Sequence, residues 1–298
     1  PLDAGAVDAL LAASEAAIER VGGLLDARRA EGKVRRCHGD LHLRNICLYG
    51  GEPTLFDCIE FSDEIACIDV LYDLAFLLMD LEHRGLRALG SAVFNRYLDR
   101  APDEAGLAAL PLMLSIRAGV RAKVAVAGSS PDAAQAQEAA AYLALARNLL
   151  CAQPPRLIAV GGLSGSGKSS VAAGLAPDFA PAPGARLLRS DVVRKTLMGV
   201  APEARLSAEA YSAEMNARVY AALRARAVTT IASGYTAIVD ATFIDEAQRK
   251  DIEAAAGEAG APFFGLWLAA PDIVLLQRVE ARRGDASDAD RDVLMRQL

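Results

Sequence analysis

The sequence predicts an α/β protein with a mostly helical region over residues 1–152 and a parallel-sheet domain over residues 153–298. In the second half, short apolar segments alternate with helical segments, which predicts a parallel sheet with helices on both faces. A glycine-rich loop follows the first of these segments, and the pair Pro154 and Pro155 separates it from an Ala-rich helical stretch. A length of 298 residues fits two domains. The strands are predicted near residues 156–160, 185–189, 236–240 and 263–268.

The first region is predicted to begin with an amphipathic helix over residues 5–31, because apolar residues recur there at helical spacing. A polar loop follows from His38 to Asn45, and short apolar segments on either side of it predict three strands. We place these strands at Val34–Cys37, Ile46–Tyr49 and Thr54–Asp57. The remainder, to residue 151, is predicted to form four helices.

The composition is that of a globular protein, since 53% hydrophobic and 23% charged residues exclude a largely disordered chain. A formal net charge of −6 argues against a surface that binds nucleic acid by bulk electrostatics. No uncharged apolar run reaches the about 18–20 residues of a membrane span, because charged residues interrupt the best candidate, 107–127. No signal peptide opens the chain, so we expect a cytoplasmic protein without a membrane partner. The chain begins at Pro1 rather than Met, which leads us to expect residues missing before it.

The five cysteines do not form a metal-binding pattern. Zinc sites usually bring two ligands within two to four residues of each other, whereas Cys37, Cys47, Cys58 and Cys67 lie about ten residues apart. We therefore expect buried free thiols in a reducing compartment.

Residues 162–169 fit the phosphate-loop pattern G-x-x-x-x-G-K-[ST] between a predicted strand and a helix that starts near Lys168. Glycines let successive N–H groups converge on phosphate oxygens, and a helix N-terminus adds positive potential. We predict that Lys168 reaches the β- and γ-phosphates of ATP and that Ser169 gives a hydroxyl to Mg²⁺. The alternative is a turn of small residues with Lys168 on the surface. The predicted nucleotide-binding residues are Gly162, Ser164, Gly165, Ser166, Gly167, Lys168, Ser169 and Ser170.

Two acids follow later strands of the predicted sheet. Asp191 comes after the second strand, where ligands bind in open α/β sheets, and is a candidate base for a substrate hydroxyl. Arg194, one helical turn on, is a candidate for holding an anionic group of the substrate. Asp240 ends the third strand and is a candidate Mg²⁺ partner. For both acids a helix N-cap is the alternative interpretation.

Three arginines follow the last predicted strand, at spacings that place them largely on one helix face or at its end. They are candidates for a lid that stabilises the charge of a transferring phosphate, and a solvated helix face is the alternative. These residues are Arg278, Arg282 and Arg283.

Residues 156–298 resemble the small P-loop kinases related to gluconate kinase, polynucleotide kinase and zeta toxins, through G-L-S-G-S-G-K-S, S-D-x-x-R-K, V-D-A-T-F, W-L-x-A-P and R-x-x-x-R-R-x-D-A-S-D-A. The resemblance implies that Lys168 and Ser169 hold phosphate and Mg²⁺, that Asp191 is the base and that the late arginines belong to a lid. Such kinases usually continue with another strand whose loop helps to hold adenine, so we expect a truncation after Leu298.

Residues 38–46, His-Gly-Asp-Leu-His-Leu-Arg-Asn-Ile, resemble the H-G-D-x-H-x-x-N loop of aminoglycoside phosphotransferases, which have a protein-kinase-like fold. In such loops one carboxylate faces the attacking hydroxyl and an amide five residues on turns to Mg²⁺. The resemblance assigns these roles to Asp40 and Asn45, and gives Asp57 the role of second metal ligand. His38 and His42 are expected to fix the loop by hydrogen bonds rather than to move protons. We expect Asp69 and Asp73 to brace it as structural acids.

The order of the two regions resembles bacterial bifunctional aminoglycoside phosphotransferase-like and P-loop ATP-binding proteins. A kinase-like fold needs an upstream β-rich lobe that grips ATP, and only 37 residues precede His38, so we expect this lobe in the parent protein. Residues 1–151 alone are then expected to be unable to transfer phosphate. The leading hypothesis is an ATP- and Mg²⁺-dependent kinase acting on a small-molecule hydroxyl. An ATP-binding regulatory switch and a zeta-toxin-like nucleotide-sugar kinase remain as alternatives.

Overall fold

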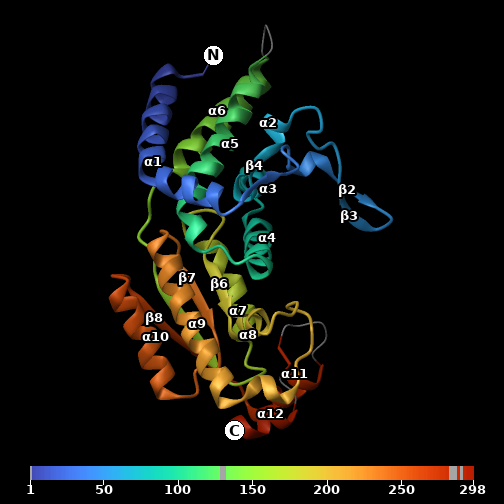
Figure 1. Ribbon diagram of the computed structural model, residues 1–298, viewed down its shortest axis with the longest axis vertical. Coiled ribbons are helices and arrows are strands. Elements are labelled where there is room, and N and C mark those ends of the chain that lie inside the picture. The colour runs from blue at the N-terminus through green and yellow to red at the C-terminus, as the bar shows by residue number, and fades with distance from the viewer. Residues whose placement is uncertain (1, 128–131, 282–286, 289–290) are drawn as a thin grey trace. The chain divides into compact units, whose positions relative to one another are not determined.

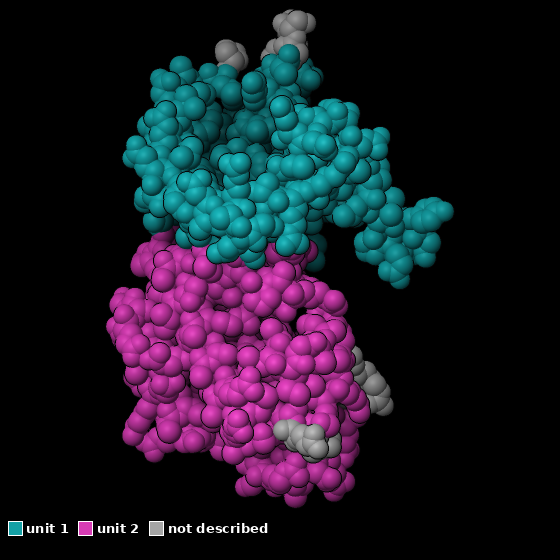
Figure 2. Space-filling model, in the orientation of Figure 1, with its two compact units in different colours: residues 1–90, 106–152, 181–183 teal, residues 91–105, 153–180, 184–298 magenta. Residues whose placement is uncertain are grey.

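The computed structural model describes residues 2–127, 132–281, 287–288 and 291–298, and the chain forms two compact units (Figures 1 and 2). Unit 1 consists of residues 1–90, 106–152 and 181–183. Unit 2 consists of residues 91–105, 153–180 and 184–298. The two units are not separated by the single boundary at residue 152 that the sequence predicted. Residues 91–105 pack within unit 2, and residues 181–183 pack within unit 1.

Unit 1 has a helical core between α3 (Val70–His83), α5 (Leu110–Ala125) and α6 (Ala133–Leu149), with α1 (Ala4–Ala30) packed beside α5 and α6 (Figure 1). The predicted first helix is therefore confirmed. Aspartates cap the start of α1, α3 and α6; the Asp132 carboxylate, for example, accepts the backbone N–H of Gln135. Side chains buried in this core include Leu74, Leu78, Leu110, Leu114 and Tyr142.

One helical stretch, Ala105–Ala125, is long and apolar enough to cross a membrane by length and composition. Its most apolar window is 61% buried inside the protein, and Arg117 within it donates from Nε to the backbone oxygen of Tyr72 at 3.2 Å. Packing in a protein core therefore accounts for its apolar composition.

The strands of unit 1 form two small antiparallel pairs. Strand β2 pairs with β3 in a hairpin, as predicted. Strand β3 ends earlier than predicted, because Asp57 has a φ of 59° and cannot continue an extended strand. Strand β1 pairs with β4, a three-residue strand that the sequence pattern did not reveal. The remaining bounds in this part of the chain are β1 (Val34–Arg36), β2 (Ile46–Tyr49), β3 (Glu52–Leu55), α2 (Asp63–Ala66), β4 (Cys67–Asp69) and α4 (Arg87–Arg100).

Unit 2 is built on a four-stranded parallel sheet with the strand order β6-β7-β5-β8, which confirms the predicted sheet. The central strands β5 (Leu157–Gly162) and β7 (Ala237–Asp240) are fully buried, as expected when helices cover both faces. The other elements are α7 (Lys168–Leu175), β6 (Arg186–Arg189), α8 (Ser190–Leu197), α9 (Ala213–Ala232), α10 (Glu246–Glu258), β8 (Phe263–Leu268), α11 (Asp272–Ala281) and α12 (Arg291–Gln297).

Alternate residues of the central strands face two different apolar clusters. Leu157 and Val239 pack with α9 and α10, through Leu223 and Ile252 among others. Ile158, Val160 and Ile238 instead pack with Ala172 of α7. Helices therefore cover both faces of the sheet, and the carboxyl ends of its strands meet at one edge.

Residues 91–105 complete unit 2 through a buried charged network around Arg186, at the start of β6. The Arg186 guanidinium donates to Glu104 at 3.0 Å, to Asp99 at 2.8 Å and to the side-chain oxygen of Asn95 at 3.1 Å. Arg226 of α9 donates to the same Glu104 carboxylate, at 3.1 Å from Nε. Because a buried guanidinium needs nearby carboxylates, this segment belongs to the interior of unit 2.

The expectation of buried cysteines is wrong for four of the five. Cys47, Cys58, Cys67 and Cys151 are exposed, and Cys37 is partly buried. All five are free thiols. Cys47 lies on the exposed β2–β3 hairpin, which has too little packing around it to bury a side chain.

Candidate active site

The glycine-rich segment leaves β5 and enters α7 through a turn that only glycine can adopt. Gly162, Gly165 and Gly167 have φ values of 139°, 84° and 96°. A Cβ at Gly162 would overlap the backbone oxygen of Leu268, and one at Gly165 would lie 2.7 Å from that of Leu275. The sequence therefore needs glycine here both for the left-handed backbone and for close packing.

This turn has the features of a phosphate-binding cradle. The positive-φ glycines and the N-terminus of α7, which begins at Lys168, lie in one short segment. The Ser166 hydroxyl oxygen is buried and has no hydrogen-bond partner among the described residues. The Lys168 ammonium folds back and donates to the backbone oxygen of Leu163 at 2.8 Å. Ser170, also predicted to bind nucleotide, lies on the first turn of α7 and is exposed. These residues fit a bound polyphosphate.

Asp240 ends β7 next to the loop and accepts a hydrogen bond from the Ser169 hydroxyl at 2.6 Å. The N-cap interpretation of Asp240 is wrong, because Asp245 caps α10. Burial raises the pKa of Asp240, while the Ser169 hydrogen bond and the charges of Lys168 and Arg189 oppose the rise.

The Ser169 hydroxyl and the Asp240 carboxylate are the oxygen donors that Mg²⁺ prefers. The described residues hold no group of three His, Cys, Asp or Glu side chains that would form an all-protein metal site. The pair therefore fits a magnesium ion that takes its remaining ligands from phosphate and water.

Asp191 lies in the first turn of α8, which starts directly after β6. Its N-cap interpretation is also wrong, because Arg189 occupies the cap position and makes no capping side-chain bond. Arg194, one turn on, is buried and stacks over the ring of Tyr211, 4.6 Å from the ring centre. It donates to the backbone oxygen of Ala210 and to the side-chain oxygen of Asn216, both at 2.8 Å.

A cavity of about 890 Å³ in unit 2 brings most of the predicted residues together. Its walls include Ser164, Lys168, Ser169, Asp191, Arg194 and Asp240. The cavity lies at the carboxyl edge of the parallel sheet, where such folds place ligands.

Several side chains that line this cavity could not be predicted from the sequence. None of them belongs to a phosphate-binding pattern, and they come from α9, α10, α12 and loops. Thr242 belongs to the motif V-D-A-T-F, and the other side chains belong to no motif that could have identified them from the sequence. They include Tyr211, Asn216, Tyr220, Thr242, Gln248, Arg296 and Gln297.

Two of these side chains are tyrosines whose phenol pKa is raised above its ordinary value. Burial raises the pKa of Tyr211, and its hydrogen bond to Asp288 at 2.9 Å adds to the rise. Burial also raises the pKa of Tyr220, against the effect of the bond to the Thr242 hydroxyl at 3.2 Å. Both phenols therefore stay neutral and act as hydrogen-bonding walls of the cavity.

The arginines predicted to form a lid can be placed only in part. Arg278, on α11, donates to the backbone oxygen of Gly165 at 3.3 Å and so contacts the phosphate loop. Arg282 and Arg283 lie outside the described residues.

The Asp40 loop in unit 1 is braced from α3. Asp73 accepts the backbone N–H groups of His38 and Gly39 at 3.1 and 2.9 Å, in agreement with its expected structural role. Asp80, which the sequence analysis did not single out, accepts the N–H of Leu43 at 3.0 Å. The loop is therefore held by carboxylates from the next long helix.

Asp69 has a separate structural role in unit 1. It forms a pair with buried Arg28 at 2.7 Å and accepts the backbone N–H of Leu71 at the start of α3. Asp69 therefore anchors α1 to α3, in agreement with the expectation that it is structural.

The candidate metal ligands of unit 1 come together only in part. The Asn45 amide nitrogen donates to the Asp40 carboxylate at 3.0 Å, and His42 Nε2 lies 3.4 Å from the same carboxylate. Asp57 is exposed and has no hydrogen bond or ion pair with Asp40 or Asn45 within the described residues. His38 makes a hydrogen bond to the backbone oxygen of Phe56 at 2.9 Å, which suits a role in fixing the loop.

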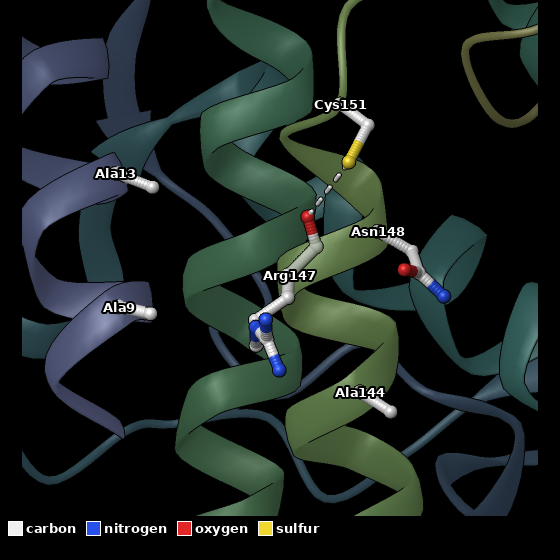
Figure 3. Close-up of a pocket in the computed structure, with 6 residues that line it drawn as sticks. All are labelled: Ala9, Ala13, Ala144, Arg147, Asn148 and Cys151. Atoms are coloured by element: carbon white, nitrogen blue, oxygen red, sulfur yellow. Dashed lines mark hydrogen bonds between the residues drawn. The ribbon is translucent and has the colours of Figure 1, made fainter. Parts of the chain in front are cut away.

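Unit 1 also has a smaller cavity of about 340 Å³ between α1 and α6 (Figure 3). The Cys151 thiol contacts the backbone oxygen of Arg147 at 3.6 Å, and three alanines form much of the wall. The lining contains no carboxylate or histidine for acid–base chemistry. We therefore take the cavity of unit 2 as the candidate active site.

Comparisons with known proteins match two different families to two parts of the chain. Residues 2–110 match the phosphotransferase enzyme family, and residues 157–298 match an AAA domain. Uncharacterized proteins of Mycobacterium bovis and of two strains of Mycobacterium tuberculosis are each 34% identical over 275 residues, or 91% of this chain and 54% of the relative. The chain thus spans about half the length of the curated relatives it matches. A solved structure from Chloroflexus aurantiacus is 22% identical, covers 44% of this chain and 68% of its own, and has a TM-score of 0.37.

Proposed function

The chain joins a region of the phosphotransferase enzyme family to a P-loop domain of the AAA type, and from this premise we propose that unit 2 transfers the γ-phosphate of ATP to a hydroxyl of a small molecule. One observation carries the proposal. Lys168, Ser169, Asp191 and Asp240 all open onto one cavity of about 890 Å³. A phosphate cradle, a hydroxyl–carboxylate pair and a candidate base therefore share one space.

Bound Mg·ATP supplies the phosphoryl group and part of the positive charge that stabilises its transfer. The backbone N–H groups of the glycine turn and the Lys168 ammonium hold the phosphate oxygens. To do so, Lys168 exchanges its bond to the Leu163 backbone oxygen for a phosphate oxygen. Ser169 and Asp240 would hold the Mg²⁺ ion that accompanies the nucleotide.

Asp191 serves as the base on the acceptor side. It accepts the proton of the acceptor hydroxyl while that oxygen forms a bond to phosphorus and the bond from phosphorus to the ADP oxygen breaks. Arg194 binds an anionic group of the acceptor. Its hydrogen bonds go to neutral oxygens, and no carboxylate of the described residues lies within 4 Å of its guanidinium. A buried cation in this situation favours an anionic ligand.

We assign the transfer to unit 2 rather than to the Asp40 loop. In unit 2 the cradle and both acids line one cavity, whereas among the described residues Asp57 makes no hydrogen bond or ion pair with Asp40 or Asn45. The proposal therefore keeps the expectation that residues 1–151 alone do not transfer phosphate.

The test is a metabolite screen with labelled ATP and Mg²⁺, using the full chain and including nucleotide-sugars among the acceptors. Lys168→Ala is expected to abolish transfer, while Lys250→Ala retains it, because Lys250 is exposed, pairs with Glu246 on α10 and lies outside the cavity lining. Asp191→Asn is expected to lower the transfer rate about 10²–10⁴-fold with ATP affinity preserved. Transfer that survives Lys168→Ala and is lost in Asp40→Asn would refute the assignment to unit 2. ATP binding without transfer to any acceptor would favour a regulatory switch.

A further inference from the structure

Helices α11 and α12 hold one part of the phosphate loop, its outer turn at Leu163–Gly165. The Leu163 side chain packs against the apolar cluster of Leu275, Val279 and Leu294, which joins α11 to α12. A Cβ at Gly165 would lie 3.1 Å from the Val279 side chain, so α11 touches the turn directly. The position of this turn therefore depends on the two helices.

Polar contacts reinforce this packing from both helices. Arg278 of α11 donates to the backbone oxygen of Gly165 at 3.3 Å. Gln297, the last residue of α12, accepts the backbone N–H of Ser164 through its side-chain oxygen at 2.9 Å. The amide oxygen of Gln297 thus fixes the backbone of the loop at Ser164, next to the glycines of the phosphate cradle.

Arg296, next to Gln297, lines the same cavity as Lys168 and Asp191. The other two cations of the cavity wall already have neutral partners: Lys168 bonds to Leu163, and Arg194 to Ala210 and Asn216. Within the described part of the chain, Arg296 has no hydrogen bond and no carboxylate within 4 Å. It is therefore a cation available to a ligand in the cavity.

We propose that α12 is part of the nucleotide site, with Gln297 as a positioning residue for the loop and Arg296 as a contact to the terminal phosphate of ATP. The inference rests on the proposed binding of ATP by this loop. The cavity extends from the loop to Asp191, and the phosphate that faces the acceptor there is the terminal one. Arg296 on the wall of this space contacts that phosphate, and ADP lacks it. The chain should then discriminate ATP from ADP through α12.

The test is calorimetric titration of the full chain with Mg²⁺ and either ADP or the non-hydrolysable ATP analogue AMP-PNP. Arg296→Ala is expected to weaken AMP-PNP binding about tenfold and to change ADP binding less than about twofold, because a charge-assisted contact to the extra phosphate is lost. Arg291→Ala is the matched control. Arg291 lies on the same helix and outside the cavity lining, and pairs at 3.6 Å with Glu280. It is expected to change neither affinity.

Gln297→Ala tests the positioning role separately. It releases the Ser164 N–H, so both nucleotides are expected to bind more weakly by a similar factor, because the loop holds phosphates common to both. Equal losses for both nucleotides in Arg296→Ala, or no loss, would overturn the role of Arg296, and unchanged binding in Gln297→Ala would overturn that of Gln297. A wild-type chain that binds neither nucleotide would refute the proposed function together with this inference.

Discussion

Glu104→Gln is expected to destabilise unit 2, because Glu104 and Asp99 are the carboxylates that neutralise buried Arg186. The Arg186 side chain is only 1% exposed, and Glu104 is 6% exposed. Burial alone would raise the pKa of Glu104, but Arg186 and Arg226 together lower it below its ordinary value. The substitution keeps the size of the side chain and removes its charge.

The magnitude follows from the burial of the network. Removing one partner of a buried ion pair costs about 3–5 kcal/mol, since the remaining charge stays desolvated. Gln keeps one acceptor oxygen, and Asp99 still pairs with Arg186. We therefore expect the free energy of unfolding to fall by about 3 kcal/mol, the lower end of this range.

Urea denaturation followed by the fluorescence of Trp267 measures this loss. Trp267 is the single tryptophan of the chain and lies on β8, so its signal reports on unit 2. The matched control is Glu258→Gln, which breaks an exposed pair with Arg224 in the same unit and should leave the free energy of unfolding nearly unchanged. A loss for Glu104→Gln no larger than that of the control would refute the reasoning.

The same network predicts a pH dependence with a definite sign. A carboxyl whose pKa is lowered by folding stabilises the protein above its unfolded pKa, and this contribution is lost as pH falls through the lowered folded pKa. The stability difference between wild type and Glu104→Gln should therefore be constant above the ordinary Glu value of 4.5 and shrink below it.

Three further predictions concern other parts of the structure. Residues 153–298 expressed alone should fail to unfold cooperatively by circular dichroism, because Arg186 loses its carboxylate partners in 91–105. Gly165→Ala should weaken ATP binding in calorimetry and lower the unfolding midpoint of Trp267 fluorescence, because a Cβ there would lie 2.7 Å from the Leu275 oxygen at a φ of 84°. In native protein, a thiol reagent should label the four exposed cysteines rapidly and Cys37 slowly, because burial and then Asp73 raise the Cys37 pKa; five equal rates would contradict this.

The sheet of unit 2 could be predicted because each strand is a short apolar run followed by a polar turn. Residues 91–105 could not be assigned to that unit from the sequence. Helical periodicity shows that a segment has an apolar face, and does not show which core receives it. The reason for its placement is the pairing of Glu104 and Asp99 with Arg186, residues more than eighty positions away.

The candidate site likewise contains residues that could be predicted from the sequence and residues that could not. Lys168, Ser169 and Asp240 could be predicted because phosphate and Mg²⁺ require given residue types at the ends of given elements. The Ser169–Asp240 hydrogen bond at 2.6 Å agrees with that reasoning. Tyr211 and Gln297 could not be found, since a tyrosine after a loop and a glutamine in a short helix carry no such pattern. Their places depend on tertiary contacts, since Tyr211, before α9, bonds to Asp288, and Gln297 of α12 bonds to Ser164 of the phosphate loop.

A strained backbone conformation occurs at Phe243, in the turn that follows β7 beside the candidate site. Phe243 is the non-glycine residue of unit 2 with a positive φ, 49°, among the described residues. Such a conformation costs on the order of 1–3 kcal/mol and persists only where surrounding contacts impose it. Arg249 donates to the backbone oxygens of Phe243 and Ile244, both at 2.7 Å, and the Phe243 ring is buried.

The strained turn links the two halves of the candidate site. Just before it, the Thr242 backbone oxygen accepts the N–H of Gly162 at 3.1 Å, and the Thr242 side chain lines the cavity. The strand that ends at Asp240 is thereby tied to the strand that begins the phosphate loop. A relaxed backbone at Phe243 would redirect the chain away from these contacts, so the strain is the expected cost of holding the acid and the loop in register.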